Sequence, residues 1–100
     1  MTTFIALITE TDQGELNIRD SVTRAAAFHD EASRFGVAVK DIYWTLGQYD
    51  GVLIFDAPDD ETAAALLHHL SAKGAVRTNA MRAFTAKEMR SILQRADDVD

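Results

Sequence analysis

Residues 43–56 have the sequence YWTLGQYDGVLIFD, in which two apolar, aromatic-rich runs flank Gly47-Gln48. Short runs of this kind favour β-strands, and a Gly at the first central position supplies the positive φ that a type II′ turn requires. The second run contains four consecutive apolar residues, from Val52 to Phe55. The stretch therefore predicts a β-hairpin with a tight two-residue turn and a second strand that is apolar on both sides.

The sequence before the hairpin predicts one strand and one helix. The apolar run over residues 4–9 favours a central strand, and Thr11-Asp12-Gln13-Gly14 supplies turn residues after it. From Asp20 or Ser21 to Phe35, apolar side chains recur every three or four residues, which makes one face of a helix that Gly36 would close. The polar residues of this helix, Arg24 among them, are expected to face water.

The sequence after the hairpin predicts two more helices and one strand. Pro58 ends the second hairpin strand, and Asp59 or Asp60 is expected to cap a helix that runs to Lys73. A strand follows over about residues 76–84. Thr85 and Glu88 then have the spacing of a capping box at the start of a third helix.

The predicted order is β-α-β-β-α-β plus a C-terminal helix, which is the ferredoxin-like arrangement of an α+β fold. This topology puts the first and third strands in the middle of an antiparallel sheet and the second and fourth at its edges. The polarity agrees, because the charged residues Lys40, Asp41, Arg77 and Arg82 all fall in predicted edge strands. We expect a single domain over residues 1–96 and a frayed acidic tail over residues 97–100.

Composition excludes several classes of function. The chain has 100 residues, a formal charge of −6 and no cysteine. Nucleic-acid binding is not expected because it needs a clustered basic surface, and neither disulfides nor Cys-ligated zinc can form. The first apolar run is too short for a signal peptide or a membrane span, so we expect a cytoplasmic protein without membrane contact. We expect no cofactor and no metal site.

Both sides of the predicted central strands are apolar, although two helices can cover only one face of the sheet. Ile5 and Leu7 alternate with other apolar residues in the first strand, and Val52 and Ile54 do so in the third. Leaving such a face in water forgoes several kcal/mol at about 25 cal/mol per Å² of apolar surface. Either the third helix or a second subunit must cover it. We favour a second subunit, in a homodimer or higher oligomer whose sheets meet face to face.

Four motifs resemble those of the GYD domain family. They are Thr11-Asp12-Gln13-Gly14 with Asn17-Ile18, then Thr45-Leu46-Gly47-Gln48-Tyr49-Asp50, then Ala57-Pro58-Asp59-Asp60-Glu61-Thr62-Ala63, and finally Val76-Arg77-Thr78 with Arg82-Ala83-Phe84. The resemblance covers roughly residues 3–90; the sequence departs after Ser21, where the family often has Pro and then Glu. The resemblance implies a protein similar to the dimeric α+β barrels, with a function that is essentially unassigned. It implies no catalytic residues.

The hairpin carries the first candidate site residues. Tyr49 and Asp50 could direct a phenol and a carboxylate into a cleft. Alternatively, Asp50 accepts hydrogen bonds from nearby backbone N–H groups, and Tyr49 packs against a neighbouring strand. Trp44 either lines an interface or a cavity, or it packs in the core.

The predicted fourth strand and the histidines carry the other candidates. Strand alternation puts Arg77 and Asn79 on one face and Thr78 and Arg82 on the other. Either pair could bind a carboxylate or a phosphate, or could form salt bridges at the sheet edge or an interface. His29 is a candidate acid or base, although a solvent-facing or packing role is the alternative. The remaining histidines, His68 and His69, are adjacent on a helix and cannot chelate a metal as an i, i+4 pair would.

These observations favour a small oligomeric module with a binding or regulatory role, which holds a small molecule in a pocket near the sheet–sheet interface. The expected ligand-binding residues are Trp44, Tyr49, Asp50, Arg77, Asn79, Arg82 and His29. One alternative is a cofactor-independent enzyme, such as a monooxygenase or an isomerase, with a His, Tyr or Asp base. Another alternative is a structural subunit that binds other proteins. A closed apolar pocket with convergent polar groups would favour a ligand or an enzyme, whereas a packed interface would favour a structural role.

Overall fold

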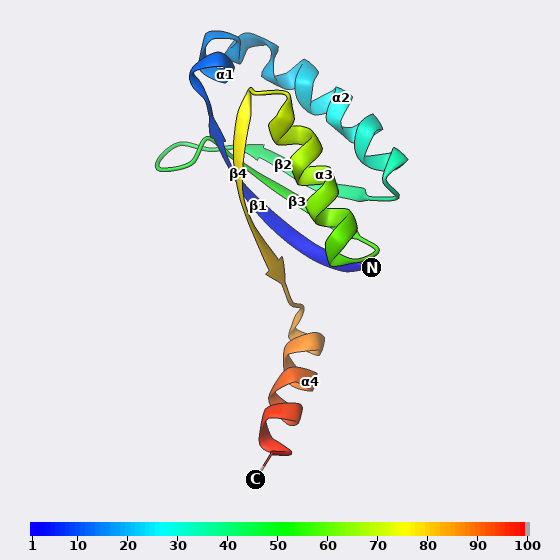
Figure 1. The fold of residues 1–100 in the computed structure, drawn as a ribbon. Helices are drawn as coiled ribbons and strands as arrows, with labels where there is room; N and C mark the ends of the chain where they lie inside the picture. The colour runs from blue at the N-terminus through cyan, green and yellow to red at the C-terminus, as the bar shows by residue number, and fades with distance from the viewer. Residues whose placement is uncertain (100) are drawn as a thin grey trace.

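A four-stranded antiparallel sheet in the order β2-β3-β1-β4 forms the body of the molecule (Figure 1). The computed structural model describes residues 1–99. Its elements are β1 Thr2–Glu10, α1 Asp12–Leu16, the 3₁₀ turn η1 Ile18–Asp20, α2 Ser21–Arg34, β2 Ala38–Trp44, β3 Gly51–Ala57, α3 Asp60–Ala72, β4 Val76–Ala83 and α4 Ala86–Asp97. The predicted ferredoxin-like α+β fold is confirmed, with the two apolar strands in the centre. Residue 100, the last of the predicted acidic tail, lies outside the described residues.

The core lies between the sheet and the pair of helices α2 and α3. Phe4 pairs with Phe55 in the β1–β3 register, and their rings stack with centroids 5.4 Å apart. Phe28 from α2 and Leu66 from α3 pack against this face and are buried. Because side chains alternate along a strand, this packing uses only every second residue of β1 and β3.

The helix ends follow the predicted capping residues. Asp59 accepts a hydrogen bond from the Thr62 backbone N–H at 2.7 Å and caps α3. Thr85 and Glu88 form the predicted capping box at the start of α4. The α3–β4 turn contains Gly74 with a φ of 87°, a left-handed conformation that glycine adopts without the steric cost of a Cβ.

The segment Thr11–Gly14 was predicted as a turn, and this prediction is wrong, because the short helix α1 begins there. Thr11 caps α1 by accepting a hydrogen bond from the Gly14 backbone N–H at 3.2 Å. The Thr11 hydroxyl also donates to the Gly74 carbonyl at 2.6 Å, and the Thr11 N–H donates to the Ala75 carbonyl at 3.0 Å. These bonds connect α1 to the segment before β4. Turn propensity depends on neighbouring residues only, so it could not predict an effect of these long-range bonds.

The predicted two-residue hairpin turn is also wrong. The strands end at Trp44 and resume at Gly51, so residues 45–50 connect them. The positive φ of Gly47 is confirmed at 116°. The connection is longer because Asp50 bonds to β1: its N–H donates to the Ile8 carbonyl at 2.8 Å, and its carboxylate accepts from the Glu10 N–H at 2.8 Å.

The other side of the sheet carries a patch that we call the open face, made of half-buried or exposed apolar side chains. Ile5 pairs with Ile54 and Leu7 with Val52 in the β1–β3 register, and all four are half-buried. Two exposed residues of the edge strands extend the patch, Tyr43 beside Val52 and Met81 beside Ile5. The predicted third helix, α4, does not lie on this patch but extends away from the sheet (Figure 1).

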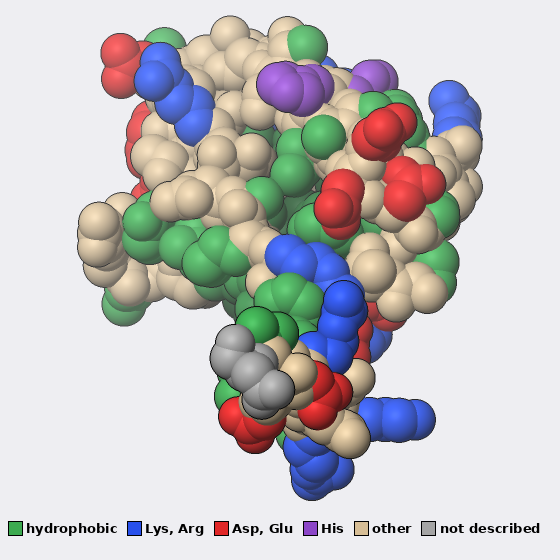
Figure 2. Space-filling view, turned by 60° about the horizontal axis from the view of Figure 1, so that its bottom comes forward, with side chains coloured by type: hydrophobic (Ala, Val, Ile, Leu, Met, Phe, Trp, Pro, Cys, Tyr) green, Lys and Arg blue, Asp and Glu red, His purple; other side chains and the backbone are tan. Residues whose placement is uncertain are grey.

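Helix α4 exposes the apolar stripe that its sequence carries. Met89 is 43% exposed, Ile92 36% and Leu93 53%, and Phe84 at the base of the helix is 53% exposed. A view toward the α4 end shows hydrophobic surface beside the base of the helix, next to Lys or Arg side chains (Figure 2). Within residues 1–99, none of the helices combines the length and the apolar character needed to cross a membrane.

Candidate functional site

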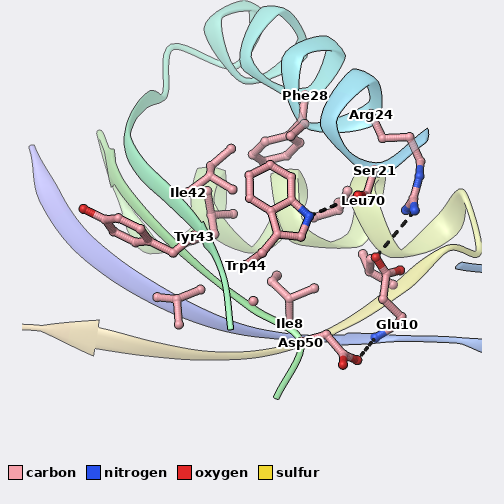
Figure 3. Close-up of a pocket in the computed structure, with 15 residues that line it drawn as sticks. Ile8, Glu10, Ser21, Arg24, Phe28, Ile42, Tyr43, Trp44, Asp50 and Leu70 are labelled. Atoms are coloured by element: carbon pink, nitrogen blue, oxygen red, sulfur yellow. Dashed lines mark hydrogen bonds and ion pairs between the residues drawn. The ribbon is translucent and has the colours of Figure 1, made fainter. Parts of the chain in front are cut away.

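A pocket of about 100 Å³ lies between α2 and one end of the sheet (Figure 3). This volume is small beside the roughly 300–1,000 Å³ of pockets for drug-sized ligands. Ile8, Phe28 and Leu70 are among its apolar walls, contributed by β1, α2 and α3. The pocket is on the helix-covered side of the sheet, opposite to the face where a sheet–sheet interface would form.

Trp44 covers one side of the pocket. It is the last residue of β2 and lies opposite Gly51 in the β2–β3 register, where there is no side chain in its way. Its indole N–H donates to the hydroxyl of Ser21, the first residue of α2, at 3.1 Å. The indole is half exposed, so it connects the apolar interior of the pocket to solvent.

Glu10 and Arg24 form the charged end of the pocket. The Glu10 side chain is only 7% exposed, and its Oε1 accepts from Arg24 Nη2 at 3.5 Å, the upper limit of a hydrogen bond. The same Nη2 donates to the Asn17 carbonyl at 3.4 Å. Among the described residues, Glu10 Oε2 and Arg24 Nε are buried and have no hydrogen-bond partner. The pair is therefore held by one long contact and keeps unused hydrogen-bonding capacity.

The sequence-based candidates fall in several places. Trp44 and Asp50 both line the pocket, and the Asp50 carboxylate also takes the structural role that was its alternative, by accepting from the Glu10 N–H. Tyr49 is half-buried in the connection between β2 and β3, where its carbonyl accepts from the Thr45 hydroxyl at 2.7 Å. His29 is exposed on α2 and is not among the residues that line this pocket.

The three β4 candidates are divided between two faces, as strand alternation predicted. Arg77 and Asn79 are exposed on the side of the open face, opposite Thr9 and Leu7. Arg82 lies on the other side, where its Nη2 donates to Glu88 at 3.1 Å and its guanidinium lies 4.5 Å from the Phe84 ring centroid. Arg82 thus forms a salt bridge at the base of α4, and it does not share a site with Arg77.

The other two histidines are on α3, and one of them joins a charged cluster with α2. His69 Nε2 lies 3.2 Å from Glu31 Oε2, and Lys73 donates to the other oxygen of the same carboxylate. The hydrogen bond from Lys73 holds the pKa of Glu31 below its usual value of 4.5. In the part of the chain that the structure describes, no group of three or more His, Cys, Asp or Glu side chains could hold a metal ion.

Sequence reasoning missed Glu10, Ser21 and Arg24. Arg24 was expected to face water, and the correction is that its side chain lies against Glu10 and is 31% exposed. Helical periodicity gives the face of α2 on which a residue lies, but it gives no information about the carboxylate that the end of β1 brings there. One sequence feature could have drawn attention to Glu10: it is the first charged residue after the apolar run of β1.

Comparison with known proteins gives one family and one relative of note. A family model described as GYD domain matches residues 4–93, which confirms the resemblance that the sequence motifs predicted. A protein of Thermus thermophilus, named glutamine synthetase and cystathionine beta-lyase binding protein, is 36% identical over 90 residues. The alignment covers 89% of this chain and 95% of that protein. No solved structure gives a significant match.

Proposed function

We propose that this chain, which belongs to the GYD domain family, is a protein-binding module that associates with metabolic enzymes through its open face. The observation that carries the proposal is the pairing of apolar residues on that face. Ile5 with Ile54 and Leu7 with Val52 form a contiguous patch across the two central strands. Helices α2 and α3 pack against the opposite side of the sheet, so the patch is accessible to a partner.

The surroundings of the open face have the composition of a protein interface. Arg77 and Asn79 lie at its β4 edge, and Asp41 and the Lys40–Asp56 ion pair, with a separation of 3.4 Å, lie at its β2 edge. An apolar centre with a polar rim is the usual anatomy of protein–protein interfaces. We therefore propose that Arg77 and Asn79 contact a protein partner, in place of a small anion.

The relative from Thermus thermophilus supports the choice of partner class. Its name states that it binds glutamine synthetase and cystathionine beta-lyase, and the alignment covers nearly all of that protein. We propose that the present chain binds enzymes of these two kinds. Binding of this sort fits the regulatory role that the sequence favoured and the protein-interaction role that it left as an alternative.

Purified proteins test the proposal directly. The chain is immobilised, and glutamine synthetase and cystathionine β-lyase from the same organism are passed over it in separate titrations. Ile54→Arg places a charge at the centre of the open face, and we expect it to weaken binding by about tenfold or more. The matched control is Val22→Arg, which makes the same kind of change at a 66% exposed site on α2.

Three results would count against the proposal. The first is the absence of saturable binding to either enzyme at about 10 μM, a concentration at which specific transient interfaces are occupied. The second is equal binding by wild type and Ile54→Arg, provided that circular dichroism shows both to be folded. The third is equal loss in Ile54→Arg and Val22→Arg, which would place the interface elsewhere.

The open face also supports self-association. We propose that two copies pair their sheets through it, as the sequence favoured, because a second copy offers the same apolar centre and needs no other component. A two-fold interface uses the same patch on both subunits. Oligomeric state in the absence of enzyme is the relevant measurement.

A further inference from the structure

Helix α4 carries an apolar stripe that stays exposed because the helix extends away from the sheet (Figure 1). Met89, Ile92 and Leu93 are each more than one-third exposed, and Ala96, also exposed, continues their spacing. Residues at these three- and four-residue steps lie on one side of a helix. A helix of this length is normally supported by packing of such a side against another element.

Charged residues flank the stripe in a regular pattern. Glu88 and Arg95 lie on one flank, and Arg90 and Asp97 lie on the other. The two members of each pair are seven residues apart, which places them within about 20° of each other around the helix. Each flank therefore has one acid and one base, in opposite order along the chain. Within residues 1–99, Arg90, Arg95 and Asp97 take part in none of the ion pairs.

From this pattern we infer that α4 packs against α4 of a second copy of the chain, stripe to stripe, in an antiparallel pair. The centre of the stripe sets the alignment, with Ile92 of one helix opposite Leu93 of the other. The same alignment places Met89 opposite Ala96. A two-fold axis repeats each of these contacts, because both copies use the same patch.

The charges on the two flanks complement one another in this alignment. Glu88 of one helix comes beside Arg95 of the other, and Arg90 comes beside Asp97. The partners in each case are offset by two residues, or about 3 Å along the axis, a distance that an arginine side chain spans. The stripe is thus self-complementary in charge as well as in apolar surface, which favours a second copy over an unrelated helix as its partner.

The position of the sheet favours the antiparallel arrangement over a parallel one. Strand β4 leads into α4, so the sheet lies beyond the N-terminal end of the helix (Figure 1). Packed helix axes are about 8–10 Å apart, whereas the two shorter dimensions of the molecule are 31 and 19 Å. A parallel pair would bring both sheets to the same end within that spacing. An antiparallel pair places them at opposite ends and also opposes the two helix dipoles.

Pairing through α4 is separate from pairing through the open face, because α4 does not lie on that face. Two helices of 12 residues form a small contact beside the roughly 1,200–2,000 Å² of stable interfaces. We therefore expect a weak interaction on its own, with a Kd of about 100 μM. In the wild type it would join copies that already associate through their sheets, and so would enlarge the assembly.

Sedimentation equilibrium with charge-reversed variants tests the inference. All proteins carry Met81→Glu, which puts a charge on the open face, and are compared from about 10 μM to about 1 mM. Arg90→Glu places two carboxylates at each contact of that flank, and Asp97→Arg places two guanidinium groups there. Each exposed contact contributes modestly, but both change from attraction to repulsion, so we expect each variant to self-associate about tenfold more weakly than the parent.

Mixing the two variants provides the decisive measurement. An equimolar mixture of Arg90→Glu and Asp97→Arg has opposite charges at both contacts, and we expect it to associate within about threefold of the parent. The matched control is Lys87→Glu, which makes the same charge reversal on the side of α4 away from the stripe and should associate as the parent does. Circular dichroism checks the folding of each variant. If Met81→Glu does not fold, the α4 variants are compared in the wild-type sequence, where reduced association appears as a smaller assembly.

Three results would overturn the inference: no association of the parent up to about 1 mM, equal self-association by Arg90→Glu and the parent, or no gain in association on mixing Arg90→Glu with Asp97→Arg. The outcome is independent of enzyme binding, because the α4 substitutions leave the open face unchanged.

Discussion

Gly14 is the glycine at which the fold leaves the least room for a side chain. A Cβ at this position would lie 2.1 Å from the Ala75 carbonyl oxygen and 2.2 Å from Glu10 Oε2. The first of these atoms is backbone, held by its hydrogen bonds with Thr11, so it cannot move aside. We predict that Gly14→Ala destabilises the protein by about 1–3 kcal/mol, the usual cost of overpacking.

Chemical denaturation tests this prediction by measuring the free energy of unfolding of Gly14→Ala and of the wild type. The control is Glu15→Ala, an exposed change at the next position of α1, which should alter the free energy of unfolding little. Wild-type stability in Gly14→Ala would mean that α1 and the segment before β4 are not packed as described.

Glu31 makes the stability of the protein sensitive to acid. The hydrogen bond from Lys73 lowers the pKa of Glu31 in the folded protein. A carboxyl group with a lowered folded pKa contributes stability above its unfolded pKa, and this contribution disappears as the pH falls through the folded value. We therefore predict that the melting temperature of the wild type falls between about pH 5 and pH 3. In Glu31→Gln, the melting temperature should fall less over the same pH window.

Melting curves of both proteins at several pH values test the Glu31 prediction. Glu15→Gln, which removes an exposed acid from α1, serves as the control and should follow the wild-type curve. Identical acid dependence in Glu31→Gln and wild type would contradict a role for the Glu31–Lys73 pair.

Single residues also show how far the candidate site could be predicted from the sequence. Trp44 and Asp50 flank the same connection, so local patterning was enough to bring both into consideration. Glu10 and Arg24 lie on different elements, and their contact depends on how α2 packs over the end of β1. Neither hydrophobic periodicity nor a sequence motif indicates how α2 packs on β1. The charged end of the pocket was therefore missed.

At the scale of elements, locally determined features were predicted and long-range ones were not. The capping box of α4 and the Asp59 cap of α3 each depend on residues three apart, and both are present as expected. The length of the β2–β3 connection depends on bonds between Asp50 and β1, whose partner in one of them is 40 positions away along the chain. Hairpin rules consider only the two strands that a turn joins.

Helix α4 depends on its own cap to an unusual degree, because its apolar stripe is exposed. A helix of 12 residues is marginal when it is not supported by packing. Thr85 supplies the cap, and its loss by Thr85→Ala costs about 1 kcal/mol in typical helices. We predict that this variant loses helical structure in α4 while the β1–β3 core keeps its stability.

Hydrogen exchange distinguishes the two parts of this prediction. Amides of α4 should exchange faster in Thr85→Ala, and amides of β1 should be unchanged. Ser91→Ala, a change at an exposed α4 position that favours helix, should leave exchange in α4 equal or slower. Unchanged exchange of α4 in Thr85→Ala would show that contacts other than the cap hold the helix.

At the scale of the whole molecule, one sheet presents two different surfaces. Successive residues of a strand face opposite sides, so Ile8 and Leu53 line the pocket while Leu7 and Ile54 belong to the open face. The continuous apolar runs in β1 and β3 are explained by this double use. A sheet that met water on one side would show alternation of apolar and polar residues instead.

The open face therefore predicts the assembly state of the isolated chain. Burying its four half-buried residues, together with exposed Met81 and Tyr43, removes apolar surface from water on both copies, at about 25 cal/mol per Å². We predict a dimer or larger oligomer at micromolar concentration by light scattering coupled to size exclusion.

Met81→Glu puts like charges at the symmetric interface without disturbing the core, because Met81 is 46% exposed, and it should shift the protein toward monomer. The control Val22→Glu, on the helix side, should remain associated. A wild-type protein that is monomeric under these conditions would leave the open face to other proteins alone, and dissociation of both variants would place the self-association on another surface.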